Sequence, residues 1–287
     1  MRGSPLSPAS ALTEPAAGTS PAPAAPHAPA RVWRREARSG LGLGAATLYL
    51  SVIVLVPLAA VVAKAFSQSP SALWDSISSS ESEKAIVTTL LAALVSAAIA
   101  SAMGTLVAWV LVRDRFPGKA IVNALIDLPF AMPSIVVGLA LLVVWGPNSP
   151  FGLDIAFTRT IVVIALLFIT LPFVVRSVQP VLAELDREAE EAAASLGASS
   201  LTIFRRIILP ALRPAILSGA ALSFARAVGE IGSLVLITAK VPIASIVIYA
   251  DVENDSPHAA ASLSIVLMAV SLVLLFLIRR LGGRVAH

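Results

Sequence analysis

The chain has no cysteine, few histidines and little charge. Only three of its 287 residues are histidine, and 13% are Asp, Glu, Lys or Arg. The lack of cysteine excludes disulfides, thiolate metal sites and cysteine nucleophiles, and His27, His258 and His287 lie too far apart in sequence to suggest a metal site. The 21 basic and 17 acidic side chains are too few for the surface of a soluble domain, in which about a quarter of residues are charged. The chain as a whole is 57% hydrophobic with a mean hydropathy of +0.88, which indicates a membrane protein.

A nucleotide-binding loop of the form Gly-x-x-x-x-Gly-Lys-Ser/Thr is also absent. The nearest candidate, Gly118-Lys119-Ala120, lacks both the upstream glycine and the hydroxyl. We therefore expect this chain to hydrolyse no ATP and to hold no cofactor and no metal of its own. An intramembrane protease is disfavoured as well, because every histidine lies outside the apolar segments and Asp127 is the only aspartate within one.

Six segments are long and apolar enough to cross the hydrocarbon core of a bilayer, which is about 30 Å thick. They are residues 41–65, 85–112, 120–145, 156–176, 214–238 and 259–278. We expect an all-α polytopic membrane domain over residues 40–285, with six transmembrane helices. Residues 1–39 precede it as a Pro/Ala-rich tail that we expect to be disordered and cytoplasmic. Prolines inside the spans, such as Pro129, Pro133 and Pro172, predict kinks.

The basic side chains are distributed unequally between the two sides of these spans. With the amino terminus inside, sixteen Lys and Arg side chains lie on the cytoplasmic side and four lie outside. The positive-inside rule therefore predicts a multi-pass protein of the cell (inner or plasma) membrane with both termini cytoplasmic. Because the positive charge is spread over four segments without interleaved aromatic residues, nucleic-acid binding is not expected.

Residues 177–213 form a long cytoplasmic loop with the pattern of two short helices. Asp186 is a typical N-cap for a helix over residues 187–196, which has acidic first turns and an alanine-rich centre. Gly197 then suits the left-handed turn after a helix. The small side chains of this helix favour docking against another surface, although an ordinary solvated hairpin has the same pattern.

The second helix of this loop is expected to begin after Ser199 or Ser200, either of which can cap it. Its apolar residues are Ile203, Phe204, Ile207 and Ile208. We expect Leu209 and Pro210 to end it, so that the fifth span begins as a separate helix at residue 214.

Seven residues of this loop occur at a characteristic fixed spacing. They are Glu191, Ala192, Ala193, Gly197, Ile207, Leu209 and Pro210. The pattern is similar to the EAA signature of ABC importer permeases. The resemblance implies that the two helices form a coupling element that fits a cleft on a separate ATP-binding subunit. Docking would then involve the Glu-Ala-Ala triplet and Gly197, at which a side chain would obstruct the turn.

Three further stretches resemble the sulfate/thiosulfate importer permeases of the CysT type. They are Asp127–Pro133, Leu171–Pro180 and Ser223–Glu230. This resemblance, which covers residues 40–285, implies the type I ABC importer permease fold and transport of sulfate or thiosulfate. One departure is residues 238–245, where such permeases usually carry a Gly-x-x-x-Lys-Thr-Glu stretch.

The same resemblance implies a set of partners. They are two copies of an ABC ATPase that uses ATP and Mg, a second, CysW-like permease that completes a heterodimer, and an extracytoplasmic sulfate-binding protein. A permease for molybdate or another oxyanion is the main alternative, and a self-powered secondary transporter is a further one.

Three charged residues within the expected spans are candidates for the translocation pathway or for helix pairing. Arg226 lies about 12 residues, or about 18 Å, into the fifth span, where contact with lipid would cost about 3 kcal/mol. It must therefore face protein or water, and Glu230, four residues later, can pair with it. Two interpretations stay open: the pair fastens helices together, or Arg226 lowers the barrier for a dianion. Asp127 is expected to pair with a buried arginine or a backbone donor.

Overall fold

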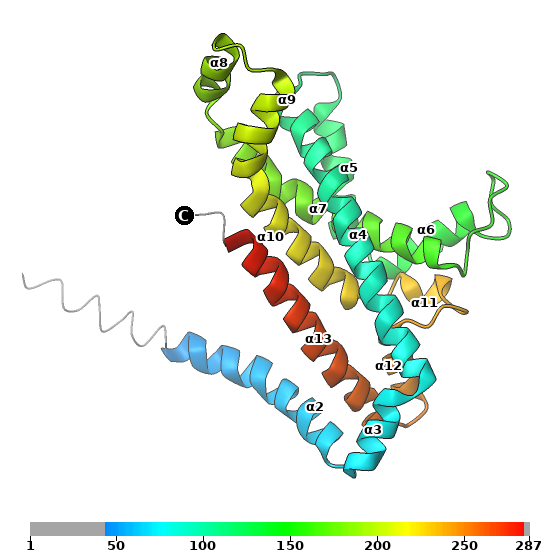
Figure 1. Ribbon diagram of the computed structural model, residues 1–287. Coiled ribbons are helices and arrows are strands. Elements are labelled where there is room, and N and C mark those ends of the chain that lie inside the picture. The colour runs from blue at the N-terminus through cyan, green and yellow to red at the C-terminus, as the bar shows by residue number, and fades with distance from the viewer. Residues whose placement is uncertain (1–43, 284–287) are drawn as a thin grey trace, which may run out of the picture. The chain divides into compact units, whose positions relative to one another are not determined.

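The computed structural model describes residues 44–283, and all regular elements in that range are helical (Figure 1). The all-α prediction is confirmed for this part of the chain, and the tail expected over residues 1–39 lies outside it. By its internal contacts the chain divides after Leu55. The described part of the first unit consists of a helix over residues 44–50 and a π-helical turn, Ser51–Leu55.

Five helical runs of the described chain are long and apolar enough to cross a membrane. They are Gly44–Phe66, Ser80–Arg113, Arg159–Glu184, Ser200–Val228 and Pro257–Ile278. Two shorter helices, α5 (Lys119–Ala131) and α6 (Ser134–Trp145), are apolar enough only when taken together, and they are bent by 112° relative to one another. This pair forms either a broken sixth span or a re-entrant loop. The chain is therefore a multi-pass membrane protein.

The third expected span, residues 120–145, is thus not one continuous helix. Met132 has an extended backbone with φ −91° and ψ 138°, and Pro133 is the N-cap of α6. The proline ring disfavours a helical conformation in the residue before it, so the chain breaks at this pair. The sequence predicted a kink here, and the structure has a complete interruption.

Two other spans end at positions that differ from the prediction. α7 (Arg159–Glu184) continues past residue 176, so the cytoplasmic loop expected from residue 177 begins only after Glu184. α10 (Leu209–Val228) was expected to reach residue 238 but ends ten residues earlier. The chain turns there because Gly229 is the C-cap and the Glu230 carboxylate accepts the backbone N–H of Ser233 at 2.9 Å.

The remaining helices of the unit from Val56 onward are shorter or lie at its ends. They are α2 (Val56–Phe66), α3 (Pro70–Ser78), α8 (Arg187–Ser195), α9 (Ser200–Ile203), the π-helical turn η2 (Phe204–Ile208), α11 (Leu234–Ile237), α12 (Ala244–Glu253) and α13 (Pro257–Gly283). The sequence did not predict α3 or α12, which are too short to show as membrane spans. α12 begins at Ala244, within the segment 238–245 where the expected Gly-x-x-x-Lys-Thr-Glu stretch does not occur.

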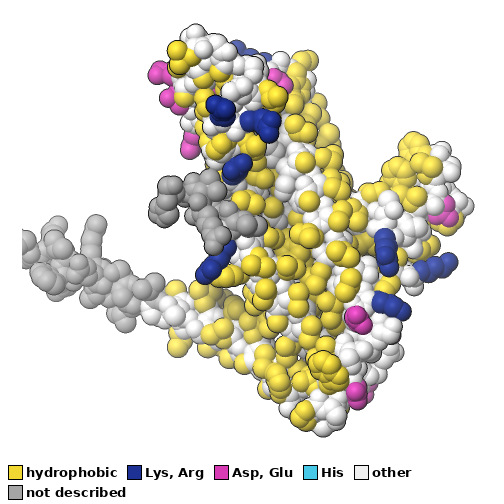
Figure 2. Space-filling model, viewed as in Figure 1, with side chains coloured by type: hydrophobic (Ala, Val, Ile, Leu, Met, Phe, Trp, Pro, Cys, Tyr) yellow, Lys and Arg dark blue, Asp and Glu magenta, His cyan; other side chains and the backbone are white. Residues whose placement is uncertain are grey.

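Three helices, α4 (Ser80–Arg113), α7 and α10, pack together at the centre of this unit. The buried face of α4 is made mostly of small residues, including Ala93, Ala97, Ala100 and Gly104, which lets the neighbouring helices approach closely. Figure 2 shows hydrophobic side chains covering the middle of α4, α10 and α13, with charged side chains gathered over α8 to α10 and over the α11–α12 region. An apolar belt between two charged ends is the surface expected of a membrane-spanning bundle.

Candidate functional site

The helix α8 carries the Glu-Ala-Ala triplet and is capped as the sequence predicted. The Asp186 side chain accepts the backbone N–H of Glu188 at 2.9 Å, which satisfies one of the free N–H groups of the first turn. At the other end Gly197 has φ +86°. Its N–H donates to the carbonyl of Ala194 at 2.9 Å, and the N–H of Ala198 donates to Ala193 at 3.0 Å. These two bonds form a Schellman motif, which requires a left-handed residue at Gly197.

The predicted docking residues lie largely on the surface of this helix. Glu191, Ala192 and Gly197 are exposed, and Ala193 is half-buried. Leu196 was not among the predicted residues, yet it is 89% exposed at the C-cap. A single exposed apolar side chain is ordinary, so Leu196 joins the docking candidates only through its place beside the Gly197 turn. The sequence signal for it was a leucine placed directly before the turn glycine.

The expected end of the second coupling helix at Leu209 and Pro210 is wrong. The N-cap is Ser199, whose hydroxyl accepts the N–H of Thr202, but from Ser200 the helix continues through η2 and α10 to Val228. Pro210 has no N–H to donate, and its ring would crowd the carbonyl four residues earlier in a regular α-helix. The wider π-turn accommodates this, since the N–H of Leu209 donates to the carbonyl of Phe204, five residues back.

The position of Ile207 follows from this continuity. It lies half-buried within η2, next to the buried Ile208, and Leu209 begins α10. We call α8, the Gly197 turn and α9 the coupling hairpin. The last three residues of the EAA-like pattern therefore join this hairpin to the membrane helix α10 and do not separate one from the other. α9, η2 and α10 are therefore parts of a single helical run over residues 200–228.

A second connection ties the hairpin to α4. The Arg113 guanidinium in the last turn of α4 forms an ion pair with Glu190 of α8, and both side chains are mostly buried. The same guanidinium lies over the Trp109 ring at 5.4 Å, and that ring contacts Phe204 edge-on with 5.8 Å between centroids. The coupling hairpin is thus fixed to α4 through α8 and through η2.

We predict that Gly197→Ala will cost about 1 to 2 kcal/mol of local stability, because a left-handed conformation is strained for a residue with a Cβ. Apart from Gly197 and its two chain neighbours, no part of the described chain lies within 4 Å of that Cβ, so the strain comes from φ. Gly118→Ala is the matched control, since Gly118 also has φ +86° and open space around its Cβ. Both variants should lower the thermal midpoint, and only Gly197→Ala should weaken binding of the ATPase subunit that the EAA resemblance implies. Equal weakening by both variants would contradict a specific role for the turn.

Arg226 and Glu230 are brought together, as the sequence predicted. An Arg226 nitrogen, Nη1, lies 2.6 Å from Oε2 of Glu230. The carboxylate is 1% exposed, and its other oxygen accepts from both the N–H (2.9 Å) and the hydroxyl (3.1 Å) of Ser233. The two residues do not share a continuous helix, because Arg226 is in the last turn of α10 and Glu230 follows the helix end. Glu230 therefore shapes the chain turn at residues 229–233.

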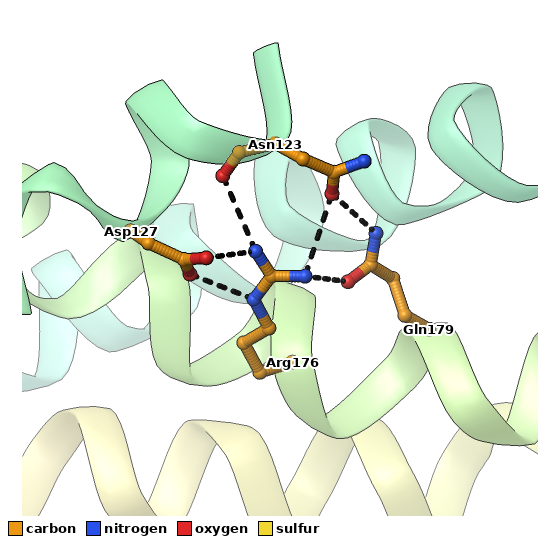
Figure 3. A network of polar contacts seen from close by, with 4 residues as sticks. All are labelled: Asn123, Asp127, Arg176 and Gln179. Carbon is orange, nitrogen blue, oxygen red and sulfur yellow. Dashed lines mark hydrogen bonds and ion pairs between the residues drawn. The ribbon is translucent and has the colours of Figure 1, made fainter. Parts of the chain in front are cut away.

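Asp127 meets an arginine, and the partner is Arg176 of α7 (Figure 3). Arg176 donates through Nε to Oδ1 of Asp127 at 2.8 Å and through Nη2 to Oδ2. It also donates to the side-chain and backbone oxygens of Asn123 and, at 2.6 Å, to Oε1 of Gln179. The sequence placed Arg176 at the boundary of the fourth span, but α7 continues beyond it, so this residue fastens α5 to α7 within the bundle.

The two arginines differ in how many of their N–H groups are used. Arg176 has all five guanidinium N–H donors directed at oxygen atoms of α5 and α7. Arg226 has one ion-pair contact with the described residues, although the two arginine side chains are almost equally exposed, at 38% for Arg226 and 36% for Arg176. The free donors of Arg226 are therefore available to an anion or to water, and those of Arg176 are not.

The segment after α11 forms a hollow of about 420 Å³ whose lining includes Glu81, Lys240 and Asp251. Burial, and then the nearby Glu81 carboxylate, raise the pKa of the Asp251 carboxyl above its ordinary value. Two carboxylates beside one lysine give the lining an excess of acidic groups, which disfavours binding of a doubly charged anion. This hollow is therefore not a candidate for the substrate.

Comparison with known proteins places these features in a family. Residues 100–287 match the family described as binding-protein-dependent transport system inner membrane component. The chain is 44% identical over 254 residues to the sulfate transport system permease protein CysT of Synechocystis sp., covering 84% of this chain and 89% of that protein. It is 39% identical over 255 residues to CysT of Salmonella typhimurium, covering 85% and 92%.

A solved structure shows the same fold. The bacterial alginate ABC transporter in complex with its alginate pentasaccharide-bound periplasmic protein superposes with a TM-score of 0.73. That likeness covers 89% of this chain and 98% of the other at 17% identity. The resemblance to ABC importer permeases and the type I permease fold expected from the sequence are confirmed. The chain belongs to the family of binding-protein-dependent transport system inner membrane components, as a membrane-spanning permease subunit.

Proposed function

We propose that this chain is the permease subunit of an ATP-driven importer for sulfate or thiosulfate, with both termini in the cytoplasm. The observation that carries the proposal is the exposed hairpin formed by α8, the Gly197 turn and α9. A docking hairpin on a chain without its own ATP-binding loop requires a separate ATPase. Sulfate is favoured over molybdate because the relatives from Synechocystis and Salmonella are named as sulfate permeases and match most of the chain.

Coupling in this proposal follows two mechanical links. The exposed residues Glu191, Ala192, Leu196 and Gly197 contact the ATPase cleft. Movement of the hairpin then reaches α4 through the Arg113–Glu190 pair and reaches α10 through the continuous helix over residues 200–228. Both receiving helices belong to the central bundle, so closure of the ATPase shifts the helices that surround the pathway.

The proposed complex contains a second, CysW-like permease, two ATPase subunits that use ATP and Mg, and an extracytoplasmic sulfate-binding protein. This chain supplies no cofactor of its own. The partly free guanidinium of Arg226 faces the pathway and attracts the dianion, and Glu230 offsets part of its charge. A partly neutralised arginine suits transport, since conduction requires binding that is weak enough for release.

The test uses cells that lack this subunit and are complemented with variants. Ala192→Trp should abolish both co-purification with the ATPase and uptake of radiolabelled sulfate, because the indole blocks an exposed docking position. Ala183→Trp, at an exposed position near the end of α7, is the matched control and should retain both.

Two outcomes would overturn the proposal. Normal sulfate uptake in the deletion strain, together with loss of molybdate uptake, would reassign the substrate. Uptake that survives deletion of residues 186–210 would indicate a secondary transporter that needs no ATPase.

A further inference from the structure

Three arginines that take no part in the coupling or pathway contacts line one hollow. Arg205 and Arg206 of η2 and Arg213 of α10 surround a space of about 530 Å³ together with Leu201, Thr202 and Leu209. All three arginines are exposed. The lining contains no carboxylate, and the ion pairs among the described residues include none of the three.

The spacing of these residues explains why they share a face. Arg206 and Arg213 are seven residues apart, close to two helical turns, and Leu209 lies between them on the same side. Arg205 and Arg206 are both in the π-turn that precedes Pro210. The turn that accommodates the proline therefore also gathers positive charge at the start of α10.

The position of the cluster along its helix indicates the partner. The run Ser200–Val228 is long and apolar enough to span a membrane, and no charged residue occurs between Arg213 and Arg226. Exposed arginines are too costly to place in hydrocarbon, so Arg213 marks the level at which this helix leaves the membrane interior. The arginines then lie where lipid headgroups lie, and Leu201 and Leu209 border them with apolar surface.

We propose that this hollow, the arginine hollow, binds the phosphate group of an anionic phospholipid. Arginine provides paired N–H donors that match phosphate oxygens, and basic pockets beside spanning helices are suited to anionic headgroups. The acidic residues of the hairpin lie on α8 instead, so the ATPase-facing helix and the arginine hollow carry opposite charge. The bound lipid would stabilise η2, the turn that connects the coupling hairpin to α10.

The test measures lipid binding to the purified full-length chain by native mass spectrometry and in nanodiscs. Phosphatidylglycerol should bind in preference to phosphatidylcholine. Each Arg→Gln replacement among the three should weaken that preference about fivefold, the factor that corresponds to about 1 kcal/mol per basic side chain near an anionic surface. The variant Arg115→Gln/Lys119→Gln/Arg187→Gln removes the same charge elsewhere and should retain the preference.

Other outcomes would overturn the proposal. If millimolar inorganic phosphate stabilises the protein in phosphatidylcholine and phosphatidylglycerol adds nothing, the hollow binds a free anion. If Arg205→Gln/Arg206→Gln/Arg213→Gln loses the ATPase while its phosphatidylglycerol preference is unchanged, the surface belongs to a protein partner. Should the triple variant fail to fold, Arg213→Gln alone decides the matter, since an unchanged lipid preference in it also contradicts the proposal.

Discussion

Replacing Glu230 by alanine is expected to destabilise the protein by about 3 kcal/mol, the lower end of the range for breaking a buried ion pair. The carboxylate is 1% exposed and serves three donors, Arg226 and two groups of Ser233. Alanine leaves all three without their acceptor and releases the turn that ends α10. The thermal midpoint of the purified protein and its resistance to proteolysis between α10 and α12 measure the loss.

Further variants separate the effect of the Glu230 charge on stability from the effect of its side-chain shape. Glu230→Gln keeps an oxygen for the Ser233 N–H but removes the charge opposite Arg226, so it should be less damaging than alanine. The double variant Arg226→Gln/Glu230→Gln removes both charges and should recover part of the loss, which a double-mutant cycle quantifies. Glu253→Ala is the control, because Glu253 is exposed on α12. A Glu230→Ala protein as stable as this control would show that the buried carboxylate does not hold the turn.

The coupling hairpin could be predicted from the sequence because its determinants are local. Asp186 as the N-cap, Ser199 as the second N-cap and Gly197 as the left-handed residue each act on backbone groups within a few residues. Capping and turn rules apply without knowledge of the neighbouring helices. The EAA-like spacing is local as well, but it was recognised as a resemblance to a known family and not from these rules.

The end of the fifth span was predicted wrongly because tertiary contacts decide it. The 214–238 segment is apolar throughout most of its length, but α10 stops at Val228 and the chain then packs against α6. Gly138 of α6 lies so close to this turn that a Cβ there would come within 2.4 Å of the Ser233 carbonyl oxygen. A hydropathy profile shows that a segment is apolar. It does not show whether the helix ends early so that the following turn can pack against another helix.

Pairing partners were predicted with unequal success for a similar reason. Glu230 is four residues from Arg226, so sequence spacing was enough to expect the pair. The partner of Asp127 lies 49 residues away on another helix, and the sequence alone gave only the requirement for a partner. Arg176 was overlooked because the predicted end of the fourth span placed it at the interface.

Arg176→Gln and Arg226→Gln are expected to fail in different ways, which distinguishes the two roles left open for intramembrane arginines. Arg176→Gln removes five donors that join α5 to α7 and leaves Asp127 unpaired (Figure 3). It should lower stability by about 1 kcal/mol, because the two side chains are 36% and 47% exposed and water screens the pair, and it should reduce the amount of folded protein. Restoring neutrality with Asp127→Asn in the same chain should recover much of that stability.

Arg226→Gln leaves the buried Glu230 carboxylate without its cation, so some loss of stability is expected. The protein that folds should still bind the proposed ATPase but take up sulfate about tenfold more slowly, a barrier increase of about 1.4 kcal/mol. The Glu230 carboxylate keeps both contacts to Ser233, so the turn after α10 persists. Uptake normalised to folded protein in the membrane is the measurement that separates the two variants. Arg226→Lys refines the result, because lysine keeps the charge but loses the planar fork of donors.

One result would contradict the proposed role of Arg226 in the pathway. If Arg226→Gln loses stability as Arg176→Gln does, and its uptake falls only in proportion to the folded protein, then Arg226 is structural as well. The geometry argues for the other result, because a guanidinium whose five donors are all satisfied has nothing left for a passing dianion. A half-exposed guanidinium with a single contact to the described chain keeps that capacity. The number of unused donors, rather than the depth of an arginine in the bundle, is therefore the property that predicts which one meets the substrate.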